Sequence, residues 1–120
     1  MKLLDALGKV VTYEVSYAQQ MEDIIINRYF HKIKKGFYVD AGCNHPVWDS
    51  VTKFFYDKGW RGVNVDPLRA MLELYREARP EDTNICAALS DKSGELEFYE
   101  DAQRSTVSLE DASRRGLSGR

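Results

Sequence analysis

One stretch of the sequence, residues 37–67, most constrains what this chain can fold into. It begins with a short apolar run, Phe37–Val39, of the kind that forms parallel strands buried on both faces of a sheet. A turn follows at Gly42, because glycine permits backbone angles that other residues disfavour. Apolar side chains at helical spacing come next, and a second apolar run ends at Asp66. This order predicts a strand, a tight turn, a helix and a second, parallel strand.

The turn at Gly42 and the acid at Asp66 together predict a nucleoside site. Right-handed crossovers bring both to the same edge of a parallel sheet. An acid about 20 residues beyond such a turn can accept hydrogen bonds from two ribose hydroxyls. A dinucleotide needs further glycines to admit its pyrophosphate, and this chain has Asn44 and Pro46 in their places. The pattern therefore favours a cofactor without phosphates, such as S-adenosylmethionine (SAM), over NAD, with a ligand-free strand–turn–helix as the alternative.

Length and composition narrow the remaining possibilities. The chain has 120 residues, enough for one small domain, and its net charge of −2 gives no reason to expect nucleic acid or an anionic membrane as a partner. No apolar run approaches the ~20 residues that span a bilayer, and no signal peptide is evident, so we expect a cytoplasmic protein. Cys43 and Cys86 have no metal-ligand spacing, which predicts buried, reduced thiols and no metal site.

The remaining segments predict further helices and strands around this unit. Helices are expected over residues 16–35, 49–58 and 67–78. Two more strands are expected over residues 84–89 and 95–100, the latter as a half-buried extension. Ser16 and Gln19 match a capping box at the start of the first helix, and Asp49 or Ser50 can cap the second.

Three separated blocks of the sequence resemble the FkbM-type methyltransferases. They are S-Y-A-Q-Q-M-E-D-I-I, the stretch that starts G-F-Y-V-D-A-G-C-N-H-P, and A-A-L-S-D-K-S-G-E-L-E-F-Y. The resemblance covers about residues 16–110. It implies an α/β fold with a partial Rossmann-like parallel sheet of the class I methyltransferases, flanked by helices and followed by a β-hairpin extension. It also implies SAM-dependent methylation of a hydroxyl on a sugar or natural product.

The resemblance implies eight residues that bind SAM. They are a loop against its methionine part (Asp40, Gly42 and Asn44), an acid on the ribose hydroxyls (Asp66), a pair beside the adenine (Ser90 and Asp91) and an N-terminal pair that closes over the methionine end (Gln19 and Asp23). No residue is assigned as the catalytic base. Replacing Asp66 with alanine should remove most of the SAM affinity and leave the fold intact, since the carboxylate is expected at the surface and not in the core.

The chain departs from the resembled family by lacking its C-terminal half. We expect an N-terminal segment over residues 1–15, a SAM-binding half domain over 16–110 and a flexible tail over 111–120. Such a half domain leaves the 37–39 strand as an open sheet edge. The alternative to an active methyltransferase is therefore a truncated, non-catalytic remnant or SAM-binding fragment that acts, if at all, through this edge. The same edge also predicts a homodimer joined across it.

Overall fold

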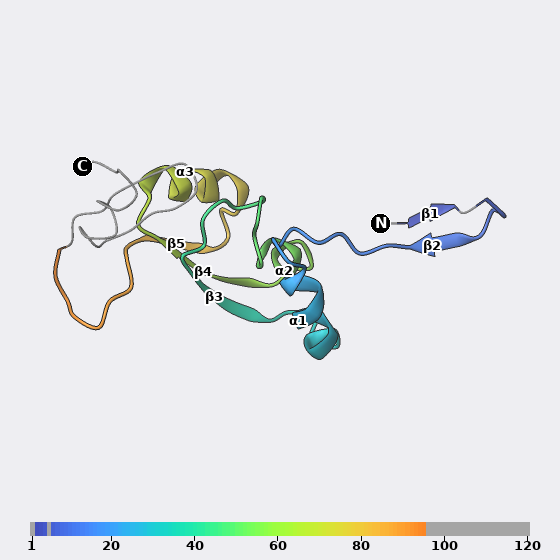
Figure 1. The fold of residues 1–120 in the computed structure, drawn as a ribbon, viewed down its shortest axis with the longest axis horizontal. Helices are drawn as coiled ribbons and strands as arrows, with labels where there is room; N and C mark the ends of the chain where they lie inside the picture. Colours follow the sequence, from blue (N-terminus) through green and yellow to red (C-terminus); the bar gives the residue numbers. More distant parts are fainter. Residues whose placement is uncertain (1, 5, 96–120) are drawn as a thin grey trace. The chain divides into compact units, whose positions relative to one another are not determined.

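The computed structural model describes residues 2–4 and 6–95 (Figure 1). The chain divides into two units, Met1–Ala88 and Leu89–Arg120. Residues 89–95, the described part of the second unit, contain no helix or strand. Most of the predicted strand at 95–100 and all of the predicted tail at 111–120 lie outside the described residues. The domain boundaries after residues 15 and 110 stay predictions.

The first unit contains a three-stranded parallel sheet in the order β3-β4-β5, side by side in Figure 1. Its strands are β3 (Phe37–Ala41), β4 (Arg61–Asp66) and β5 (Thr83–Cys86). Val39 lies opposite Val63, and Val63 lies opposite Thr83. The carboxyl ends of all three strands therefore meet at one edge. The prediction of a small α/β fold with a parallel sheet flanked by helices is confirmed.

Three helices accompany this sheet, and a short hairpin precedes them. The helices are α1 (Glu22–Phe30), α2 (Lys53–Asp57) and α3 (Arg69–Ala78), and α3 contacts both β4 and β5. The hairpin pairs β1 (Lys2–Leu4) antiparallel to β2 (Val10–Thr12). No helix in residues 2–4 and 6–95 is long and apolar enough to cross a membrane.

The first helix begins six residues later than predicted, and Asp23 is the reason. The capping box is wrong, because the Ser16 hydroxyl donates to the Asp23 carboxylate at 2.6 Å and makes no cap for the helix. The same carboxylate accepts the backbone N–H groups of Tyr17 and Ala18. These bonds hold residues 16–21 outside the helix. Met21, immediately before α1, is left-handed with a φ of 61°.

The second helix is also shorter than predicted. Asp49 has a left-handed φ of 56°, so it cannot belong to a helix. Ser50 accepts the N–H of Lys53, the first residue of α2, at 3.1 Å. Ser50 therefore accepts one of the backbone N–H groups that have no partner within the helix, although it lies before the cap residue, Thr52.

The hydrophobic core contains three buried aromatic residues, Phe54, Phe55 and Trp60. The rings of Phe55 and Trp60 lie 4.9 Å apart, and the indole N–H of Trp60 donates to the Ile33 carbonyl at 3.1 Å. Sheet edge β3 is open among the described residues, as predicted, with Phe37 67% and Val39 66% exposed. The core thus forms beside β3 while the outer side chains of that strand face solvent.

Candidate functional site

Asp66 closes the turn at the carboxyl edge of the sheet. Its side chain is buried, with the residue only 5% exposed. One oxygen accepts the Asn44 N–H at 2.9 Å, and the other accepts the Leu68 N–H at 2.9 Å. Gly42, with a φ of +72°, donates to the Val65 carbonyl at 2.8 Å. Both carboxylate oxygens are therefore used by the backbone that follows β3 and β4.

We expect Asp66→Ala to destabilise the fold, which corrects the expectation that its carboxylate lies at the surface. The change leaves two backbone donors without an acceptor, at a cost of about 2 kcal/mol in the free energy of unfolding. Urea denaturation measures this cost. Asp57→Ala is the matched control, because Asp57 pairs with Lys53 at the exposed surface, where such a pair contributes little. Equal stability of the two variants would contradict this role for Asp66.

Asp40 and Thr52 link β3 to the segment before α2. The Thr52 hydroxyl donates to Asp40 at 2.9 Å and accepts from the Arg79 guanidinium at 2.7 Å. Burial raises the pKa of the Asp40 carboxyl, while the Thr52 hydrogen bond and the Arg79 charge lower it. The structure thus brings four of the eight predicted residues together at this edge: Asp40, Gly42, Asn44 and Asp66.

The other four predicted residues lie elsewhere along the chain. Asp23 is fully buried, and its oxygens also accept the Ile24 N–H at 2.8 Å. Gln19 is exposed in the segment before α1. Ser90 and Asp91 are exposed members of the second unit, 3.4 Å apart through their side-chain oxygens. Asp23 therefore has a structural role, because its carboxylate fixes the segment before α1.

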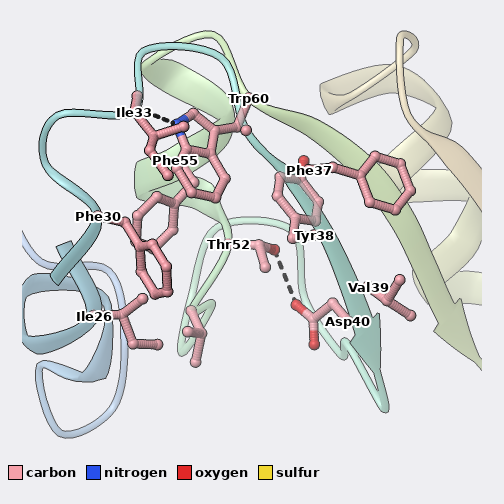
Figure 2. Close-up of a pocket in the computed structure, with 12 residues that line it drawn as sticks. Ile26, Phe30, Ile33, Phe37, Tyr38, Val39, Asp40, Thr52, Phe55 and Trp60 are labelled. Carbon is pink, nitrogen blue, oxygen red and sulfur yellow. Dashed lines mark hydrogen bonds between the residues drawn. The ribbon is translucent and has the colours of Figure 1, made fainter.

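An apolar groove of about 520 Å³ runs beside β3 (Figure 2). Figure 2 shows Phe30, Phe55 and Trp60 on one side and the exposed strand on the other. Asp40 and Thr52 contribute polar groups to this otherwise apolar lining, and neither cysteine belongs to it. The groove is thus a surface separate from the thiols.

The two cysteines differ sharply in their surroundings. Both are free. Cys43, just after β3, is only 3% exposed, and burial raises the pKa of its thiol to about 12. Cys86 ends β5 and is exposed, with its sulfur 3.5 Å from the Pro67 carbonyl. The prediction of buried thiols is confirmed for Cys43 and wrong for Cys86. Polar Thr83 and Asn84 in the same strand were the available sign of a solvent-facing edge.

This difference predicts that one thiol reacts in the native protein and the second reacts only after unfolding. The reactive form is the thiolate, and burial disfavours it at Cys43. Titration with a chromogenic disulfide at mildly alkaline pH should release one equivalent rapidly, and guanidinium chloride should expose the second. Mass mapping should place the fast modification on Cys86. Rapid modification of Cys43 in folded protein would contradict the burial described above.

A comparison with models of protein families finds a match that covers most of the first unit. The SelR domain matches residues 9–79, more than half of the 120 residues. The matched range includes Cys43 and ends before Cys86. No curated protein and no solved structure matches the chain.

The SelR match overturns the expectation of an FkbM-type methyltransferase. The SelR domain is that of methionine sulfoxide reductase B, so SAM as cofactor and a sugar or natural-product hydroxyl as acceptor are both wrong. The alternative of a truncated, non-catalytic remnant is not supported either. A physical reason for the error lies in the turn after β3. A glycine and an acid at these positions also serve to close a turn, because the Asp66 carboxylate accepts two backbone N–H groups.

Proposed function

The chain belongs to the SelR domain family, and on that basis we propose that it reduces methionine sulfoxide, with Cys86 as the reacting thiol. The observation that carries the choice of residue is the exposure of the two cysteines. Cys86 is open to solvent, whereas Cys43 is buried and its raised pKa keeps it protonated. An attacking thiol must reach the substrate and ionise. Cys86 meets the first requirement and Cys43 meets neither.

The proposed reaction transfers one oxygen from sulfur to sulfur. The Cys86 sulfur attacks the sulfoxide sulfur, the sulfur–oxygen bond of the substrate breaks, and the products are a thioether and a sulfenic acid on Cys86. Two thiols of an external reductant then return the sulfenic acid to a thiol, and one disulfide and one water are formed. Buried Cys43 is unsuited to the second step. We therefore propose a dithiol of the thioredoxin type as the reductant.

A free, exposed thiol persists as a thiol only where the surroundings are reducing. We propose on this ground that the protein works in a reducing compartment such as the cytoplasm. The two unpaired cysteines support this proposal, since neither is committed to a disulfide.

Zinc, which SelR domains typically bind, does not fit the donor set of this chain. Structural zinc sites use four cysteine or histidine ligands held close together. The chain has two cysteines and two histidines in all, and no group of three or more histidine, cysteine or acidic side chains in residues 2–4 and 6–95 could hold a metal ion. No step of the reaction proposed above is routed through a metal.

The assay for this proposal offers the two sulfur epimers of methionine sulfoxide separately, with dithiothreitol as the reductant. Enzymes of this kind accept one epimer each. We expect methionine to form from one epimer in proportion to the protein concentration, measured by chromatography. Folded protein that reduces neither the free amino acid nor an oxidised peptide would overturn the proposal.

A further inference from the structure

We infer that this chain keeps its fold without zinc and that the guanidinium of Arg79 is a cross-link that holds the loop between β3 and α2. The inference depends on the family membership and the donor set, and it holds whether or not the chain reduces methionine sulfoxide. It concerns how the loop after the sheet is fixed, which the proposed reaction leaves open.

The chain has two cysteines and two histidines, the side chains that usually bind structural zinc. They lie apart from one another or already make hydrogen bonds. Cys43 is buried, and Cys86 is exposed at the end of β5. His45 accepts two backbone N–H groups at its Nδ1, from Val47 at 3.1 Å and Trp48 at 3.0 Å. His31, just after α1, has its Nδ1 3.0 Å from the Arg28 carbonyl. The two histidines make hydrogen bonds to nearby backbone, and one cysteine is buried while the other is exposed. These four side chains therefore do not form a tetrahedral zinc site.

Arg79 reaches across the same region with three hydrogen bonds to one loop. It is only 1% exposed. Its Nη1 donates to Thr52 Oγ1 at 2.7 Å, and its Nη2 donates to the Pro46 carbonyl at 2.6 Å and to Ser50 Oγ at 2.8 Å. One side chain at the end of α3 therefore holds three points of residues 46–52.

Aromatic rings complete the surroundings of this guanidinium. Its carbon lies 4.9 Å from the centre of the Tyr75 ring and 5.6 Å from that of Tyr56. Ring faces attract a cation, and a guanidinium offers a planar fork of donors that an ammonium lacks. No salt bridge to Arg79 occurs within residues 2–4 and 6–95, and its charge meets Asp40 through the shared Thr52 hydroxyl.

This arrangement makes the loop depend on a buried cation with neutral partners. A structural metal stabilises a small domain by tying distant segments together. Arg79 does the same here, because it joins the end of α3 to the loop after β3, more than 25 residues earlier in the chain. Nε of Arg79 has no hydrogen-bond partner, so all of the hydrogen bonds from Arg79 to the loop come from its two terminal nitrogens.

The first experiment measures metal content and stability in the full chain. Protein purified without a metal-binding tag should contain far less than one zinc ion per chain by elemental mass spectrometry. Its Tm should be the same before and after dialysis against a strong chelator. Near-stoichiometric zinc together with a fall in Tm on chelation would overturn the inference.

The second experiment tests the cross-link itself. We expect Arg79→Met to lower the Tm by about 10 °C or more, since three acceptors lose their donor. Arg76→Met is the matched control, because Arg76 lies on the same helix, is exposed and pairs only with Glu73 among the described residues. Its Tm should stay close to that of the unchanged chain.

A lysine variant separates charge from geometry. Arg79→Lys keeps the cation but cannot present the same fork, so its Tm should fall between those of the unchanged chain and Arg79→Met. If Arg79→Met does not fold, Thr52→Val, which removes one of the three acceptors, should still give a smaller, measurable fall. Limited proteolysis should then cut the loop at 46–52 faster than in the Arg76→Met control. Equal Tm values and equal cutting in all the variants would overturn the inference.

Discussion

Cys86→Ser should reduce the formation of methionine from methionine sulfoxide to the background rate, whereas Cys43→Ala should leave the rate near that of the unchanged chain. A serine hydroxyl ionises far less readily than a thiol, so the variant has no nucleophile able to accept the oxygen. The contrast depends on exposure, because Cys86 is open to solvent and Cys43 is buried. Initial rates with excess dithiothreitol measure the effect.

A trapping reagent for sulfenic acids gives a second measurement of the same event. After one turnover without reductant, the adduct should appear on the peptide that contains Cys86 and be absent from Cys86→Ser. Both variants should keep the Tm of the unchanged chain to within a few degrees if the loss is chemical. Full activity in Cys86→Ser, or an adduct on Cys43, would assign the reaction to a different residue.

Asp82→Ala should strongly destabilise the fold, because it removes the acceptor of three donors. The Asp82 carboxylate is buried and accepts the Gly62 N–H at 2.9 Å, the Asn64 side-chain amide at 2.9 Å and the Tyr38 hydroxyl. Each stranded donor costs about 1–3 kcal/mol, so the free energy of unfolding should fall by about 4 kcal/mol. Urea denaturation measures this change.

The neighbouring residue provides the control for Asp82. Glu81 is exposed and pairs with Arg61 at 2.9 Å, and the Arg61 hydrogen bond lowers the pKa of its carboxyl. An exposed pair of this kind contributes little, so Glu81→Ala should change the free energy of unfolding by about 0.5 kcal/mol or less. A similar loss in both variants would show that the loop, and not the buried carboxylate, sets the stability.

The sheet was predictable because short apolar runs, a glycine turn and the spacing between strands all indicate the same unit. β3 and β4 lie where the sequence predicts them, and the open edge at β3 follows from their order. The start of α1 was not predictable from local pattern. Asp23 draws the Ser16 hydroxyl and two backbone donors into a turn, which a capping pattern at Ser16 does not reveal.

The candidate site was harder to predict than the sheet. Asp66 and Gly42 occupy positions that can bind a nucleoside, yet their own hydrogen bonds close a turn. A sequence pattern does not distinguish a carboxylate that is free to bind a ligand from one whose oxygens already accept hydrogen bonds from backbone N–H groups. The exposure of Cys86 likewise depends on which strand ends the sheet, and Arg79 gains its role from a loop that ends 27 residues before it.

The position of β4 between two partners has a consequence for how the sheet opens. β4 is hydrogen-bonded on both sides, whereas β3 is paired only with β4 among the described residues. Outward-facing amides of β3 can exchange their hydrogens with water while the sheet stays intact, but β4 amides must wait for a neighbouring strand to leave. The amides of β4 should therefore show the slowest hydrogen exchange of the sheet. The outward-facing amides of β3, beside the groove, should exchange through local fluctuations that leave the rest of the sheet paired.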